Sequence, residues 1–160
     1  MVDIDSSIEH CIISLQPEIL KTIVHIESSF NPYAIGIVNG KLSSQPKSKE
    51  QAINITNYLL SKNINFSVGL GQINIHNIKR LNLSVSELFD VCNNLSAIEK
   101  VYNDCYLRAL KKYKDPIARD MAFSCYFSGD FQRGFEIKDK NGYSYVYKAN
   151  LRYNSYKKRN

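Results

Sequence analysis

The sequence lacks tryptophan, and it has no run of the ~18 apolar residues that a membrane-spanning helix needs. It contains no glycine-rich phosphate-binding loop, so we expect no nucleotide site of that kind. Internal repeats, low-complexity tracts and long linkers are absent as well. For 160 residues these absences predict one globular domain, and they give no reason to expect a cofactor.

Metal-ligand patterns are also missing. His10, His25 and His76 show no paired-ligand spacing, and no two cysteines lie at zinc-finger spacing, so we expect no metal site. His25 precedes a core position, which favours a structural role. A thiol nucleophile at Cys125 with His76 as its base is conceivable, but no spacing supports it.

Acidic residues are absent from the C-terminal end. The net charge is +6, and five basic residues but no acid lie in 148–160, so the rest carries 21 − 5 = 16 basic against 15 acidic groups. We therefore expect a nearly neutral domain over 1–150 and a basic tail over 151–160. Such a tail either is a solvated chain end or attracts an anionic polymer or a membrane surface.

The four cysteines leave two alternatives open. Their even number allows two disulfides in three pairings among Cys11, Cys92, Cys105 and Cys125. Buried thiols are expected in the cytosol and disulfides in an exported protein. The start "MVDIDSSIEHCIISL" has no basic segment and only a short apolar run, so the protein is either cytosolic or an export signal has been removed.

The hydrophobic spacing predicts a mostly helical protein with a small β element. Predicted helices start at Pro17, Ser48, Asn94 and Asp115-Pro116, and they end at Asn31-Pro32, near Lys62, after Leu110 and at Ser128-Gly129. Ser84 and Glu87 predict a further capping box. The alternation in 63–70 predicts a strand, for which 34–42 is the nearest partner. The segment 143–152 fits a strand or a helix.

Glu27 continues an apolar helical face, because it follows Val24 by three residues and Ile23 by four. Burial and the nearby C-terminal end of the helix would both raise the pKa of its carboxyl group. A carboxyl group that stays protonated near neutral pH suits general-acid catalysis. The alternative is a helix-end glutamate that turns to solvent.

A second catalytic acid is hard to find. Glu50, Glu87, Asp90 and Asp130 are the candidates, and none falls on a clearly buried face. A glycosidase with two carboxylates needs them ~5–9.5 Å apart. The sequence therefore favours a mechanism with one carboxylate or no catalysis.

Amides and tyrosines supply candidate binding groups. Gln72 and Asn74 follow glycines that allow close backbone approach, although an ordinary polar turn would look the same. Eleven tyrosines are present, and Tyr126, Tyr143, Tyr145 and Tyr147 gather late in the chain. Tyrosine is common at carbohydrate-binding clefts, and it is also an ordinary core residue.

Four motifs in order resemble the soluble lytic transglycosylase family of bacterial peptidoglycan-cleaving enzymes. They are "ESSFNP" at 27–32, "GLGQIN" at 69–74, "CYFSG" at 125–129 and Tyr145-Val146. The stretches "NPYAIGIV", "CNNLSA" and "CYFSGDFQRGF" resemble most closely the subgroup that accompanies type IV secretion systems.

The resemblance implies a lysozyme-like domain in which the small β element lies beside a cleft and Glu27 is the only catalytic carboxyl. Cleavage between N-acetylmuramic acid and N-acetylglucosamine would form a 1,6-anhydro ring without water. Ser28, Gln72, Asn74, Tyr126 and Tyr145 match positions of the family's motifs, and we assign them to substrate binding. The match of Tyr145 also favours a helix for the last segment.

Four positions depart from the wider family pattern, and they concern the fine positioning of substrate. They are Gly36, Gly71, Phe127 and Asn141.

The resemblance implies a periplasmic enzyme, whose partners would be peptidoglycan strands and type IV secretion components, with neither nucleic acid nor a transmembrane segment. Two alternatives are a hydrolysing muramidase, with an acid such as Asp130 as second carboxylate, and a weakly active scaffold that binds peptidoglycan.

Overall fold

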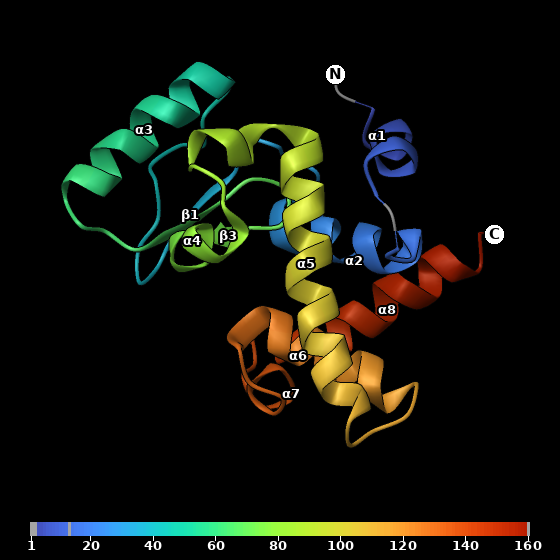
Figure 1. Cartoon of the computed structure of the whole chain (residues 1–160). Coiled ribbons are helices and arrows are strands. Elements are labelled where there is room, and N and C mark those ends of the chain that lie inside the picture. Colours follow the sequence, from blue (N-terminus) through green and yellow to red (C-terminus); the bar gives the residue numbers. More distant parts are fainter. Residues whose placement is uncertain (1–2, 13, 160) are drawn as a thin grey trace. The chain divides into compact units, whose positions relative to one another are not determined.

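The computed structural model describes residues 3–12 and 14–159 (Figure 1). In chain order the elements are α1 (Ile4–Cys11), α2 (Pro17–Ser28), β1 (Ile35–Ile37), α3 (Lys49–Ser61), β2 (Phe66–Val68), β3 (Ile73–Asn74), η1 (Ile75–Asn77), α4 (Ile78–Leu81), η2 (Ser86–Phe89), α5 (Val91–Leu110), α6 (Ile117–Ser128), α7 (Arg133–Glu136) and α8 (Tyr145–Lys157). The predicted fold class, mostly helical with a small β element, is confirmed.

Two compact units make up the chain. The first contains Met1–Ile13 and Glu27–Ile98, and the second contains Ser14–Ile26 and Glu99–Asn160. The chain passes from one unit to the other within α2 and within α5. Each unit is therefore built from two separate stretches of sequence.

The first unit holds a three-stranded antiparallel sheet in the order β1-β2-β3. Ile35 pairs with Val68, and Ser67 pairs with Asn74. The predicted partnership of 34–42 with 63–70 is thus confirmed. The strand β2 is shorter than predicted because Asn63 and Gly69 on either side adopt positive φ angles of 55° and 78°.

Helix starts in the first unit follow side-chain capping. Ser48 accepts a hydrogen bond from the Gln51 backbone N–H at 3.2 Å and begins α3. Ser84 and Glu87 form the predicted capping box, with reciprocal bonds of 2.7 and 3.2 Å. The prediction that Asn94 caps α5 is wrong, because α5 begins at Val91, with Asp90 accepting a bond from the Asn93 N–H at 3.0 Å.

The second unit contains α6, α7 and α8, with α7 and α8 both packed on α6. Gly129, at φ 75°, ends α6 where the sequence predicts. The ambiguous segment 143–152 is mainly helical, since α8 begins at Tyr145 and the Ser144 hydroxyl accepts the Tyr147 N–H at 3.1 Å. The position predicted as the start of the basic tail, residue 151, falls inside α8, and Tyr153 beyond it is buried.

Each unit carries one disulfide. Cys11 pairs with Cys92 in the first unit and Cys105 with Cys125 in the second, with Cα–Cα distances of 5.3 and 5.7 Å. These pairings select one of the three combinations that the sequence allows. They also contradict the thiol-nucleophile alternative, because the Cys125 sulfur is bonded.

Over residues 3–12 and 14–159, no helix has both the length and the apolar character needed to cross a membrane.

Candidate functional site

Glu27 is the penultimate residue of α2, and its side chain is half-buried. Ile23 and Val24, one turn earlier, are fully buried. Glu27 therefore extends the buried face of its helix to the helix end, where a carboxyl group is partly shielded from water but can still be reached.

The backbone turns sharply just after Glu27 and Ser28. Ser29 and Phe30 have φ angles of 50° and 63°, in the left-handed region, and end the helix at Ser28, before the predicted break at Asn31-Pro32. Left-handed backbone costs roughly 1–2 kcal/mol at such residues.

The left-handed residues other than glycine show a pattern. Among the described residues they are Ser29, Phe30, Gln72 and three asparagines, the type that tolerates this conformation best. The three that are not asparagine all lie at, or within two residues of, a predicted site residue. Strained backbone of this kind gathers at functional sites.

A short chain of hydrogen bonds links the α2 end to the loop that holds Gln72. The Asn31 N–H donates to the Ser28 carbonyl at 3.1 Å, and the Ala34 N–H donates to the Asn31 carbonyl at 3.3 Å. The Ala34 carbonyl in turn accepts bonds from the Gly69 N–H at 2.8 Å and from the Gln72 side-chain amide at 3.0 Å. Ser28 and Gln72 are thus tied into one backbone arrangement.

The Gln72 amide is held firmly. Its Nε2 donates to the carbonyls of Ala34 and Gly69 at 3.0 and 3.1 Å, which occupies both amide hydrogens. Its Oε1 lies against Gly36, where a Cβ atom would come within 2.5 Å. Gly36, one of the departures from the wider family, therefore makes room for this orientation of Gln72.

Asn94 fixes the same loop through buried hydrogen bonds, a role that the sequence did not reveal. This fully buried residue accepts the Gly71 N–H at 2.8 Å, and it donates to the carbonyls of Val68 and Leu88 at 3.2 and 2.8 Å. A side chain at Gly69 would overlap Asn94, and Gly69 also has a φ of 78°. Gly69, the first glycine of "GLGQIN", thus lets the loop close onto Asn94.

Asn74 is committed to the local structure. Its amide nitrogen donates to Asn65 Oδ1 and Ser67 Oγ at 2.9 and 3.2 Å, and its Oδ1 accepts the His76 N–H at 3.0 Å. These bonds fasten β3 to the segment around β2 and begin η1. Its role in substrate binding stays a prediction.

The two predicted site tyrosines belong to the second unit. Tyr126, on α6, is half-buried, and Tyr145, the first residue of α8, is buried. The Tyr145 ring stacks on the exposed Phe127 ring, with centroids 4.8 Å apart and planes 17° apart. Phe127, a second departure from the family pattern, thus supports Tyr145 directly.

The other candidate acids are exposed, and three of them serve as caps. Asp90 begins α5, Glu87 closes its capping box, and Asp130 Oδ1 accepts the N–H groups of Gln132 and Arg133 at 2.7 and 2.9 Å. These hydrogen bonds lower the pKa of both Glu87 and Asp130. A carboxyl group with a lowered pKa is poorly suited to act as a general acid.

Glu99 is a buried carboxylate that the sequence argument missed. Its Oε1 accepts hydrogen bonds from the Ser14 N–H and hydroxyl at 2.6 and 2.7 Å and from the Leu15 N–H at 2.9 Å. It follows Leu95 by four residues, so the helical spacing used for Glu27 would also have found it. Its bonds fix the segment just before α2.

Within the described part of the chain, no three His, Cys, Asp or Glu side chains lie close enough together to hold a metal ion. His25 Nδ1 lies 2.9 Å from the Tyr156 hydroxyl oxygen. Desolvation, and secondarily the charge of Arg152, lower the pKa of His25. The predicted structural role of His25 is consistent with this enclosed contact.

The fold and the site define a mostly helical domain in which one helix-end glutamate adjoins a small sheet and a glutamine-bearing loop. The family described as "Transglycosylase SLT domain" matches residues 9–146, so the chain belongs to that family.

The curated relatives that the chain matches are consistent with this family. The chain is 40% identical over 143 residues to the "Type IV secretion system protein virB1" of Brucella abortus (strain 2308), and this match covers 88% of the chain and 60% of the relative. It is 29% identical over 141 residues to the "Protein virB1" of Agrobacterium tumefaciens (strain 15955), with 88% of the chain and 57% of the relative covered. The chain thus spans less than two thirds of the length of these relatives. No solved structure matches it.

Proposed function

We propose that this chain is a peptidoglycan lytic transglycosylase, which cleaves the β-1,4 bond between N-acetylmuramic acid and N-acetylglucosamine without water. The observation that carries the proposal is membership of the transglycosylase family together with Glu27 at the partly buried end of α2.

In the proposed first step, Glu27 donates its proton to the glycosidic oxygen as the bond from that oxygen to the anomeric carbon breaks. The N-acetyl oxygen of the muramic sugar bonds to the anomeric carbon and carries the positive charge into its ring. The leaving sugar departs with the Glu27 proton.

In the second step, the Glu27 carboxylate removes the proton from the carbon-6 hydroxyl of the same muramic sugar. That oxygen displaces the N-acetyl oxygen at the anomeric carbon and closes the 1,6-anhydro ring. Glu27 regains one proton, so the enzyme returns to its starting state. Because the substrate supplies the nucleophile, one carboxyl group is sufficient.

The state of the remaining acids favours this route over hydrolysis. A hydrolase of the usual kind needs a second carboxylate to activate water. Asp90, Asp130 and Glu99 each accept backbone hydrogen bonds that fix local structure, and such carboxylates are poor candidates for that task.

Ser28, Gln72, Asn74, Tyr126 and Tyr145 are proposed to contact the glycan. Since both amide hydrogens of Gln72 are bound to backbone carbonyls, Gln72 would serve a sugar hydroxyl as an acceptor through Oε1. Tyr145 would contact the glycan with its ring fixed by stacking on Phe127.

The proposed setting is the periplasm, where the enzyme would open the wall locally for a type IV secretion apparatus. The printed names of the relatives support this role, and two disulfides suit an oxidising compartment. Peptidoglycan strands and secretion components would be its partners.

The test is digestion of purified peptidoglycan, with products identified by mass, for the wild type, Glu27→Gln and Asp130→Asn. We expect 1,6-anhydromuropeptides from the wild type and from Asp130→Asn, and a loss of at least about a hundredfold in rate for Glu27→Gln. Reducing-end products that disappear in Asp130→Asn would instead indicate a hydrolysing muramidase. Binding without turnover by the wild type would indicate a scaffold.

A further inference from the structure

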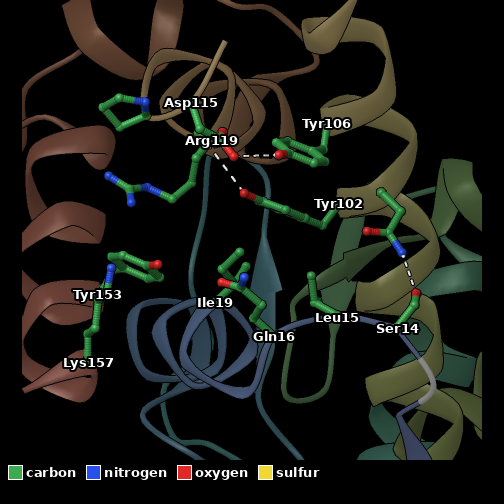
Figure 2. Close-up of a pocket in the computed structure, with 12 residues that line it drawn as sticks. Ser14, Leu15, Gln16, Ile19, Tyr102, Tyr106, Asp115, Arg119, Tyr153 and Lys157 are labelled. Carbon is green, nitrogen blue, oxygen red and sulfur yellow. Dashed lines mark hydrogen bonds between the residues drawn. The ribbon is translucent and has the colours of Figure 1, made fainter. Parts of the chain in front are cut away.

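The second unit contains a pocket of about 460 Å³ that does not include any predicted site residue (Figure 2). Its volume lies in the ~300–1,000 Å³ range of small-ligand sites. The segment before α2, the C-terminal half of α5, the start of α6 and the end of α8 line it.

One side of the pocket carries two cations on a shared aromatic ring. The Arg119 guanidinium lies 4.2 Å from the centroid of the Tyr153 ring, and Lys157 Nζ lies 5.9 Å from the same centroid. Figure 2 shows Arg119, Tyr153 and Lys157 along one side of the pocket. Arg119 is only 18% exposed, and Asn150 Oδ1 accepts a hydrogen bond from its Nη2 at 3.1 Å. Its Nη2 also lies 3.6 Å from Asp120 Oδ1, an ion pair, so the guanidinium is held in place before any ligand arrives.

Asp115 lies beside Arg119 in Figure 2, and a tyrosine fixes its carboxylate. The Tyr106 hydroxyl donates to Asp115 Oδ2 at 2.6 Å, a short bond of the kind made to an ionised carboxylate. This bond is the first cause of the raised pKa of Tyr106. One Asp115 oxygen is thus occupied, while its charge remains at the pocket.

The rest of the pocket lining is also held by internal hydrogen bonds. Asn103 Nδ2 donates to the Ser14 hydroxyl at 3.1 Å, and Glu99 holds Ser14 through two bonds. Tyr102 closes one wall with a buried ring, and its hydroxyl donates to the Arg119 carbonyl at 3.5 Å. The pocket is therefore built from side chains that already hold one another.

We propose that this pocket binds a short zwitterionic peptide, with its terminal carboxylate at Arg119 and Lys157 and its terminal ammonium group at Asp115. A simple anion would leave the Asp115 charge facing it, and a simple cation would face two positive groups. A neutral sugar would use neither charge. A ligand with both charges can contact Arg119, Lys157 and Asp115 together, and each charge-assisted bond adds to its affinity.

The test uses the full-length chain and three probes: alanyl-alanine, its N-acetyl form and its C-terminal amide, each titrated by two-dimensional NMR. We expect saturable shifts near Asn103 and Tyr153 with the free dipeptide, and at least about tenfold weaker binding of each capped form, because each cap removes one charge-assisted bond. Absence of saturation with the free dipeptide, or equal binding of either capped form, would overturn the proposal.

Matched variants locate the site. Lys157→Met and Asp115→Asn should each weaken binding roughly five- to tenfold, and Asp115→Asn keeps an acceptor for Tyr106. Lys158→Met, at the next residue and outside the pocket lining, should bind as the wild type does. Equal losses at Lys157 and Lys158 would contradict the assignment.

The inference is independent of the proposed catalytic function. Glu27→Gln should bind the dipeptide with wild-type affinity, so failure of catalysis and failure of peptide binding can be told apart.

Discussion

The orientation of a single amide depends on a residue without a side chain. Gln72 has a left-handed backbone, its Nε2 is bound twice, and its Oε1 lies where a Cβ on Gly36 would be 2.5 Å away. Any side chain at position 36 must push the amide away from at least one of its two carbonyls.

We therefore predict that Gly36→Ala lowers kcat/KM on peptidoglycan about tenfold, or ~1.4 kcal/mol, while the unfolding midpoint changes little. Gly40→Ala is the matched control, because its Cβ would meet only the Ile37 side chain, at 3.2 Å. Activity equal to that of the control would mean that the position of the Gln72 amide is unimportant.

His25 gives a second prediction, about stability and pH. Its lowered pKa means that the unfolded chain, with an ordinary histidine pKa of about 6.5, takes up the proton first as pH falls. The contribution to stability is therefore present above about pH 6.5 and is lost as pH falls from there through the folded-state pKa. Urea unfolding between pH 7.5 and about 5 should show this decline, which His25→Gln should reduce and His76→Gln should not.

Single residues differed in how far they could be predicted. Glu27 and Glu99 both follow helical spacing, so the pattern that predicts Glu27 also indicates Glu99, four residues after Leu95. For Asn94 the sequence predicts a helix cap, since asparagine is common there. Its buried bonds to Gly71, Val68 and Leu88 depend on tertiary contacts that local sequence does not encode.

At the scale of elements, the loop between β2 and β3 is held by a helix. Asn94 on α5 accepts the Gly71 N–H, and Gly69, which has no side chain, allows that approach. The position of Gln72 thus depends on α5 as well as on the sheet.

We predict that Asn94→Ala lowers the free energy of unfolding by about 2–5 kcal/mol, because it leaves the Gly71 N–H and two carbonyls buried without partners. Asn93→Ala, on the same helix turn, should cost less than about 1 kcal/mol. Urea denaturation measures both. Equal effects would show that the buried bonds of Asn94 contribute little.

Element boundaries followed local signals only in part. Gly129 ended α6 and Ser48 began α3 as predicted, because these signals act through the nearest backbone. α2 ended early, since two left-handed residues precede its Asn-Pro pair. The last segment became a helix although its tyrosines alternate, because Val146, Ala149 and Tyr153 are buried on one helical face.

At the scale of the whole molecule, charge is distributed unevenly, with five basic residues and no acid in 148–160. Lys158 and Arg159, just beyond the end of α8, are exposed. Exposed charge of one sign attracts an anionic polymer over a range that salt shortens.

We predict that the double variant Lys158→Gln, Arg159→Gln binds sedimented peptidoglycan roughly two- to fivefold more weakly at low salt and equally well at high salt. Turnover of short soluble glycans should be unchanged. A difference that persists at high salt would indicate a specific contact instead of long-range attraction.

In the proposed mechanism, Glu27 alone carries both proton transfers and the substrate supplies the nucleophile. Digestion in water labelled with heavy oxygen tests it most directly, since mass spectrometry of the new muramic ends reports whether solvent oxygen has entered. We expect 1,6-anhydro ends without the label, and no new ends with Glu27→Gln. Reducing ends that carry one labelled oxygen would contradict it.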